Sequence, residues 1–176
     1  MVRIGVLSDT HLRHALSGAG FLDTIEKTVF RDVGMILHAG DLVDPSVLCA
    51  FYPRTVHAVR GNMDPADVCL PLRKVFEVAG YRFGMMHGWG APDGLAERIL
   101  QEFSGDSLDC LVYGHSHMPD CRHLGRLLLF NPGSAISPRG GHRASVGILE
   151  VDGSGIRGKI LPIDEHCFGP ERVKRG

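Results

Sequence analysis

The 176-residue sequence contains no C-x-x-C pair, no long apolar run and no excess of basic residues. Its five cysteines are scattered and odd in number, which argues against a disulfide framework and a cysteine-ligated zinc site and favours reduced thiols. The apolar run before Ser8 is too short for a signal peptide, and no run approaches the length of a membrane span. The balance of 19 basic and 20 acidic residues does not indicate nucleic-acid binding. We therefore expect a cytoplasmic protein without membrane contact.

The length and composition predict a single folded domain. Hydrophobic residues make up 44% and charged residues 22% of the chain, which is typical of globular proteins. No repeat or low-complexity segment divides the sequence. We place one domain at residues 1–166 and a solvated C-terminal tail at residues 167–176. The pattern leaves the oligomeric state open, a homo-oligomer included.

Short apolar runs alternate with amphipathic stretches in the first half of the chain. Strands are predicted at residues 2–7, 33–37 and 55–59, and helices at 21–31 and 45–51. This alternation indicates a largely parallel sheet. The second half predicts a hairpin over 74–78 and 81–86, a helix over 93–103, and strands at 109–113, 127–130, 145–151 and 156–161. The late strands suggest a second sheet, so we expect an α/β fold with two sheets between helical layers.

Polar residues of the metal-ligating type follow the carboxyl ends of five predicted strands. Ligands in α/β sheets bind outside the carboxyl ends of the strands, so these residues are expected to converge. Each of them alone is more often an ordinary loop residue, and only their joint placement carries the prediction. The candidates are Asp9, His11, Asp41, Asn62, His87, His115 and His117.

The chemistry of this set favours divalent transition metals. Mixed carboxylate, amide and imidazole ligands suit Mn²⁺, Fe²⁺, Co²⁺, Ni²⁺ or Zn²⁺. Seven ligands are too many for one ion but are enough for two ions that share a carboxylate. Neighbouring glycines (Gly40, Gly61, Gly88 and Gly114) allow the backbones to approach closely.

These residues also carry a family resemblance. Together they resemble the motifs of the calcineurin-like metallophosphoesterases: Asp9-x-His11, Gly40-Asp41, Gly61-Asn62, His87-Gly88 and Gly114-His115-x-His117. The short chain, the segment Asn131-Pro132-Gly133-Ser134 and the following Pro138-Arg139 are similar to the small phosphodiesterase branch. The resemblance implies a four-layer α/β/β/α sandwich of two mixed β-sheets flanked by helices.

The resemblance further implies how the ligands divide. One metal would be held by Asp9, His11, Asp41 and His117, and the other by Asp41, Asn62, His87 and His115, with Asp41 as the bridge. Asp41, Asn62 and His87 would thus serve catalysis through the two metals, whose shared hydroxide attacks phosphorus. Manganese is favoured, with nickel, iron, cobalt or zinc as alternatives.

The expected activity is hydrolysis of a small-molecule phosphodiester. A non-catalytic scaffold that binds a partner on the same fold, and a phosphomonoesterase or nucleotide hydrolase, remain alternatives. Many relatives carry a histidine after Gly-Asn, but this chain has Met63, which cannot donate a proton to the leaving group. His14, Asp64 and Arg139 are the candidate substrate contacts, and Ser134 has no assigned role.

Overall fold

The computed structural model describes residues 1–13 and 18–163. Its first sheet combines strands from the beginning and from the end of these residues. The strand order is β10-β9-β1-β2-β3. Strands β1, β2 and β3 are parallel to one another, whereas β9 is antiparallel to both β1 and β10. The strands are β1 (Val2–Leu7), β2 (Met35–His38), β3 (Thr55–Ala58), β9 (Ser145–Asp152) and β10 (Gly155–Pro162).

The second sheet is formed by the middle of the chain and has the order β4-β5-β6-β8-β7. Strands β5, β6 and β8 are parallel, and the edge strands β4 and β7 are antiparallel to their neighbours. The strands are β4 (Arg73–Val78), β5 (Tyr81–Met86), β6 (Cys110–Tyr113), β7 (Asp120–Leu124) and β8 (Leu127–Asn131).

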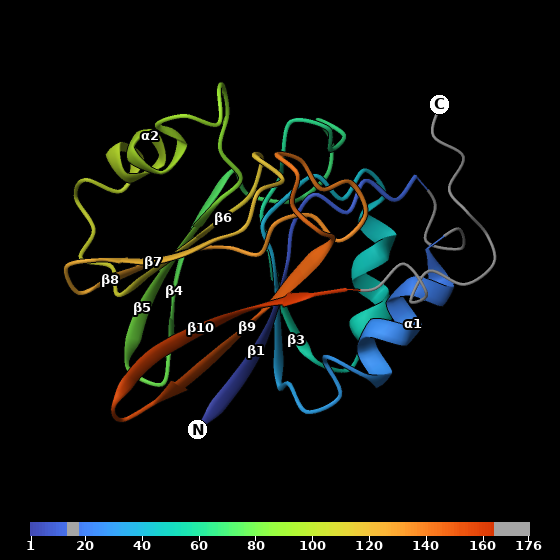
Figure 1. The fold of residues 1–176 in the computed structure, drawn as a ribbon, viewed down its shortest axis with the longest axis horizontal. Coiled ribbons are helices and arrows are strands. Elements are labelled where there is room, and N and C mark those ends of the chain that lie inside the picture. The colour runs from blue at the N-terminus through green and yellow to red at the C-terminus, as the bar shows by residue number, and fades with distance from the viewer. Residues whose placement is uncertain (14–17, 164–176) are drawn as a thin grey trace.

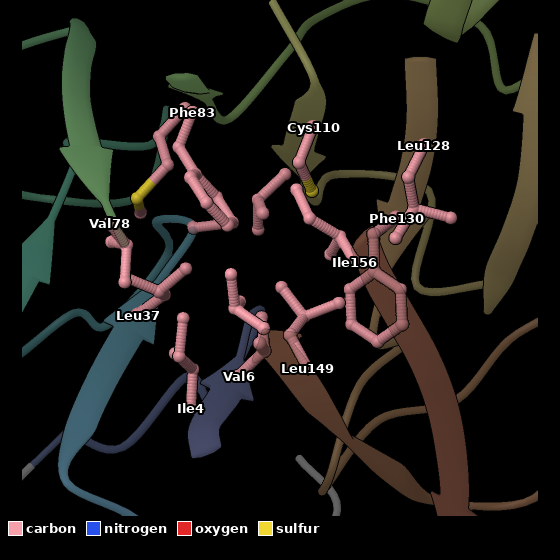
Figure 2. Packing of buried hydrophobic residues seen from close by; sticks show 14 of the residues in the cluster. Ile4, Val6, Leu37, Val78, Phe83, Cys110, Leu128, Phe130, Leu149 and Ile156 are labelled. Carbon is pink, nitrogen blue, oxygen red and sulfur yellow. The ribbon is translucent and has the colours of Figure 1, made fainter. Parts of the chain in front are cut away.

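Apolar side chains between the two sheets form the central core (Figure 2). Ile4 and Val6 of β1 and Leu37 of β2 face Phe83 of β5 and Phe130 of β8 across the interface. Because alternate residues of a strand point to opposite faces, the outer faces of the sheets need covers of their own.

Helices provide these covers. The α-helix α1 (Ala19–Lys27) and the 3₁₀-helix η1 (Pro45–Phe51) pack on the first sheet, and α2 (Leu95–Glu102) packs on the second (Figure 1). The result has four layers, in the order helix, sheet, sheet, helix. The predicted α/β/β/α sandwich is confirmed.

Several details differ from the sequence-based expectation. Helix α1 ends at Lys27 rather than at residue 31, and the turn that follows directs Phe30 and Val33 into the core beneath the first sheet. The helix over 45–51 is a 3₁₀-helix whose start is capped by the Asp44 carboxylate, which accepts from Ser46 N at 2.9 Å. Strand β7 was not predicted, because four of its five residues are exposed and give no apolar alternation.

No helix within residues 1–13 and 18–163 has the length and apolar character to cross a membrane. His14 and the predicted tail at 167–176 lie outside the described residues.

Candidate metal centre

Three parallel strands of the first sheet and two parallel strands of the second deliver the predicted ligands to one place at the edge of the sandwich. Asp9, Asp41 and Asn62 follow β1, β2 and β3 of the first sheet, and His87 follows β5 of the second. His115 and His117 follow β6. The two sets meet across the sheets, since the His87 Nδ1–H donates to the Ala39 carbonyl at 2.7 Å and His115 N donates to Asp9 Oδ2 at 3.0 Å.

The backbone is strained at five of the seven predicted ligands. Asp9, His11, Asp41, His115 and His117 have φ angles between 45° and 69°. Residues with a Cβ rarely adopt this left-handed region, which costs on the order of 1–3 kcal/mol each. Such strain persists only where the surrounding contacts enforce it, and it concentrates at functional sites.

Asp9, His11 and His117 form the first cluster of ligand atoms. His117 Nε2 lies 3.2 Å from both Asp9 Oδ1 and His11 Nε2. Two atoms that bind one ion at about 2.1 Å, at angles between tetrahedral and octahedral, lie about 3.0–3.4 Å apart. The observed spacings match that geometry.

Asp41 and His87, together with Asp9, form a second group of ligand atoms that could hold one ion. The His115 ring lies beside His87, with ring centroids 5.3 Å apart, and contacts Asn62. We refer to the predicted ligands Asp41, Asn62, His87 and His115 as the second cluster. His87 Nε2 lies 3.3 Å from Asp41 Oδ2, and His115 Nδ1 lies 3.0 Å from Asn62 Oδ1. The two clusters are contiguous, because Asp9 Oδ1 is 3.8 Å from His87 Nε2 and Asp41 Oδ2 is 3.8 Å from His11 Nε2. Both carboxylates thus lie between the clusters, and the bridging role of Asp41 stays a prediction.

Hydrogen bonds to backbone carbonyls fix which ring nitrogen of three histidines faces the clusters. A carbonyl oxygen only accepts, so the nitrogen that contacts it carries the proton. His87 Nδ1–H donates to Ala39 O, His117 Nδ1–H to Ser137 O at 2.5 Å, and His115 Nε2–H to Gly90 O at 2.9 Å. In each neutral ring the other nitrogen therefore presents a lone pair to an oxygen that also accepts.

Where two hydrogen-bond acceptor atoms face each other at this distance, a cation or an added proton is required between them. Asp9 Oδ1 and His87 Nε2 are buried and make no hydrogen bond in the described part of the chain. Such unpaired buried groups are costly. Oxygen and nitrogen atoms arranged in this way fit divalent metal ions, and carbonyl-bound histidines are the usual orientation of metal-ligating imidazoles.

The electrostatics of the clusters keep both carboxylates ionised. Burial acts to raise the pKa of Asp9, but the nearby imidazoles of His117 and His87 outweigh it and hold the pKa below its ordinary value. Burial likewise opposes ionisation of Asp41, but His87 and the backbone of Met63 hold its pKa low. Burial lowers the pKa of His87, yet Asp41 and Asp9 together raise it above the ordinary value. A positive charge is therefore favoured between these groups.

Two glycines allow the loops to pack this closely. A Cβ on Gly61 would lie 2.1 Å from Asp41 Oδ1, and a Cβ on Gly114 would lie 1.9 Å from Ser8 Oγ. Any other residue at either position would push a ligand loop away. The expectation that glycines permit the close approach is confirmed at these two positions.

The candidate substrate contacts have different surroundings. The buried Asp64 carboxylate accepts from the backbone N–H groups of Asp41 at 3.0 Å, Val43 at 2.8 Å and Gly61 at 2.7 Å, so it holds two ligand loops together. Arg139 is exposed next to the first cluster, where its backbone N–H donates to the His117 carbonyl at 3.4 Å. Contact of Asp64 or Arg139 with substrate stays a prediction.

The backbone groups that orient the histidines could not be predicted from the sequence. The carbonyls of Ala39, Gly90 and Ser137 belong to residues with no distinctive side chain, so the sequence contains no signal for them. The buried side chains of Asn131 and Ser134 also lie against the ligand loops. Their segment was noticed in the sequence, but its role could not be derived there.

Comparisons with known proteins agree with this geometry. The family model of the calcineurin-like phosphoesterase superfamily domain matches residues 2–154. A probable metallophosphoesterase of Methanothermobacter thermautotrophicus is 36% identical over 160 residues, which cover 90% of this chain and 91% of that protein. The phosphodiesterase YfcE of Escherichia coli K12 is 33% identical over 112 residues, about half of each chain (55% and 53%).

A solved structure has the same fold. Wild-type Vps29 of Entamoeba histolytica, in complex with Zn²⁺, matches with a TM-score of 0.66 over 91% of this chain and 98% of that chain. Its sequence identity is 22%, so this likeness concerns the fold alone.

Proposed function

The chain belongs to the calcineurin-like phosphoesterase superfamily, and from that premise we propose that it is a phosphodiesterase that uses two divalent metal ions. The observation that carries the proposal is the pair of adjoining clusters in which lone pairs of histidines face carboxylate and amide oxygens. One cluster would hold each ion. When bound, two such ions supply an activated water nucleophile and stabilise negative charge on the phosphoryl oxygens.

The charge of the centre supports an anionic substrate. Asp9 and Asp41 are the carboxylates of the two clusters, so a site that holds two divalent ions has a net positive charge. A phosphodiester monoanion complements that charge. A monoester dianion would also be attracted, so the preference for diesters rests on the family and on the relative named as a phosphodiesterase.

The residues around the clusters have distinct proposed roles. The exposed Asn62 and half-buried His115 lie on the open side, where a substrate phosphate can enter. Arg139, exposed beside His117, would bind a phosphate oxygen. Met63 is 56% exposed after Asn62 and offers an apolar surface but no proton to the departing alcohol.

The direct test combines metal analysis with paired substrates. The purified protein is stripped, reconstituted with Mn²⁺, Ni²⁺ or Zn²⁺, and assayed with an aryl phosphodiester and the matched monoester. We expect two metal equivalents and faster hydrolysis of the diester. Asp41→Ala and His87→Ala should abolish turnover, whereas His123→Ala, an exposed histidine of β7, should not.

The outcomes separate the alternatives. Faster monoester hydrolysis would favour a phosphomonoesterase or nucleotide hydrolase. Full metal loading without hydrolysis of either ester would favour the non-catalytic scaffold. Activity that survives Asp41→Ala would contradict the assignment of the site.

A further inference from the structure

The segment at residues 131–134 reaches the metal centre because β8 is parallel to β6. Its Asn131 is the last residue of β8, so the segment emerges at the same edge as the His115 and His117 loop. Asn131 and Ser134 are completely buried. Buried polar side chains need partners, and both find them in the loops that carry the candidate ligands.

Asn131 joins the segment to the loop after β6. Its amide Nδ2 donates to the Gly114 carbonyl at 2.9 Å and to Ser116 Oγ at 3.1 Å. Its Oδ1 accepts from Gly133 N at 2.9 Å. Both donors and the oxygen of this amide therefore hold its own turn against the loop of the two histidines.

Ser134 connects two members of the first cluster. Its hydroxyl donates to the Asp9 carbonyl at 2.7 Å and accepts from the N–H groups of Ile136 at 3.3 Å and Ser137 at 2.9 Å. Ser137 in turn offers the carbonyl that accepts from His117 Nδ1–H at 2.5 Å. One hydroxyl thus links the backbone of Asp9 to the group that orients His117.

Both linked ligands need this support. Asp9 and His117 have φ angles of 52° and 59°, a conformation that persists only where neighbouring contacts enforce it. The Ser134 hydroxyl holds the carbonyl of the strained Asp9. The turn it closes places Ser137 O where it selects the Nδ1–H form of His117, and this leaves Nε2 free to face Asp9 Oδ1.

We propose that Ser134 is a positioning residue of the first cluster, which couples the backbone of Asp9 to the tautomer of His117. The inference rests on the proposed metal-dependent function, but it concerns the geometry of the protein before metal or substrate binds. It assigns a role to the one segment of the sequence pattern that the ligand set leaves unexplained.

Ser145 provides a matched control. It is also a buried serine whose hydroxyl donates to a backbone carbonyl, that of Pro132, at 2.7 Å. This bond fixes the same segment but does not reach a ligand. Both Ser134→Ala and Ser145→Ala remove a 2.7 Å hydrogen bond donated to a backbone carbonyl, and only Ser134→Ala also removes the two bonds accepted from Ile136 and Ser137. Only the first variant should affect the cluster. Ser134→Cys keeps a weaker donor and should give an intermediate result.

The experiment follows ring ¹⁵N signals of His117 and His87 in metal-free protein and then during Zn²⁺ titration against a competing chelator. Amide spectra establish that each variant is folded. In Ser134→Ala we expect loss of the Nδ1–H tautomer preference of His117 and about 10- to 100-fold weaker zinc binding at the first cluster, the range for residues that orient ligands. The His87 ring, held by Ala39 O, should retain its tautomer in every variant.

Two results would overturn the inference: a Ser134→Ala protein with wild-type His117 signals and zinc affinity, or an equal effect from Ser145→Ala. Hydrolysis by the wild-type protein is measured separately. If the wild type binds zinc and fails to hydrolyse phosphoesters, the proposed function fails, and the ring signals still decide the role of Ser134.

Discussion

The two ligand clusters use similar residues but differ in enclosure. In the first, Asp9 and His117 have side chains 0% and 4% exposed, and His11 is 24% exposed. In the second, Asp41 and His87 are as deeply buried, at 3% and 2%, but Asn62 is exposed and His115 half-buried. A closed cluster holds its geometry before an ion arrives, whereas an open one leaves room for substrate. The difference suggests a division between a tightly held ion and an exchangeable ion close to the reaction.

The largest effect expected from this comparison separates one histidine of each cluster. His117→Ala should lose one metal equivalent at all practical concentrations and lower the rate of diester hydrolysis by about 10²–10³-fold, as when one preorganised electrostatic group is removed. His115→Ala should retain two equivalents when metal is in excess, because the rest of its cluster persists. Its activity should recover as metal is added. Metal analysis and rates at increasing Mn²⁺ measure both.

His123→Ala again serves as the control for loss of an unrelated histidine. Equal metal loss in His117→Ala and His115→Ala, or recovery of both with excess metal, would show that enclosure does not distinguish the clusters.

A buried histidine that is in neither cluster sharpens the contrast. Both ring nitrogens of His38 have protein partners: Nδ1 accepts from Gly40 N at 3.3 Å, and Nε2 contacts Thr10 Oγ1 at 3.1 Å. Burial lowers the pKa of His38 to about 4 from 6.5. The ring is thus neutral when folded, and on acidification the unfolded chain takes up this proton first.

The contribution of His38 to the free energy of unfolding is therefore complete above pH 6.5 and is lost as the pH falls towards 4. The loss should reach about 3 kcal/mol. Denaturant unfolding of metal-free wild type and His38→Gln at pH 7, 6, 5 and 4 measures it, and the variant should show the shallower dependence on pH. Parallel curves for the two proteins would contradict the assignment of His38 as a buried neutral ring.

The architecture could be predicted from the sequence because it leaves side-chain signals, and signals of the same kind predict the ligands. Apolar periodicity marked nine of the ten strands, and polar residues at five strand ends marked the centre. Strand β7 was missed because its exposed residues contribute no apolar pattern. The direction of β8, which brings Ser134 to the site, is a property of strand pairing between distant segments that no local pattern encodes.

The orientation of the ligands could not be predicted for a different reason. It depends on carbonyl groups, such as those of Gly90 and Ser137, and every residue has one. Asp64 illustrates the same limit. Its position after Asn62 suggested a substrate contact, but in the fold its carboxylate is occupied by three backbone N–H groups.

A smaller effect on metal binding is expected from Arg98 of α2, which supports a loop of the second, more exposed cluster. The Arg98 guanidinium donates to the carbonyls of Asp93 at 2.7 Å, Trp89 at 3.1 Å and Ala91. It thereby holds the loop whose Gly90 carbonyl orients His115. Arg98→Met should weaken metal binding at the second cluster by about 10-fold, the lower end for groups that orient ligands, and leave the first cluster unchanged.

Arg73→Met is the control at the other end of α2, where the Arg73 guanidinium donates to the backbone carbonyl of Glu102 at 3.1 Å. The ring ¹⁵N signals of His117 report the first cluster, and those of His87 and His115 report the second. A loss at both clusters in Arg98→Met, or at either in Arg73→Met, would mean that α2 acts by general stability.

The smallest effect concerns the leaving group at the open rim. Met63 follows Asn62, is 56% exposed and cannot donate a proton, so we expect the departing alcohol to leave largely as its anion. Rates for a series of aryl phosphodiesters should therefore fall steeply as the pKa of the alcohol rises. Met63→His places a proton donor there and should flatten the dependence, with a gain of a few-fold for the poorest leaving groups and none for the best.

Met118→His, on the loop beside the enclosed His117, is the comparison variant and should leave the slope unchanged. A flat wild-type profile with chemistry rate-limiting would show that another group supplies the proton, and an equal gain from both variants would remove the reason to place the leaving group at the open cluster.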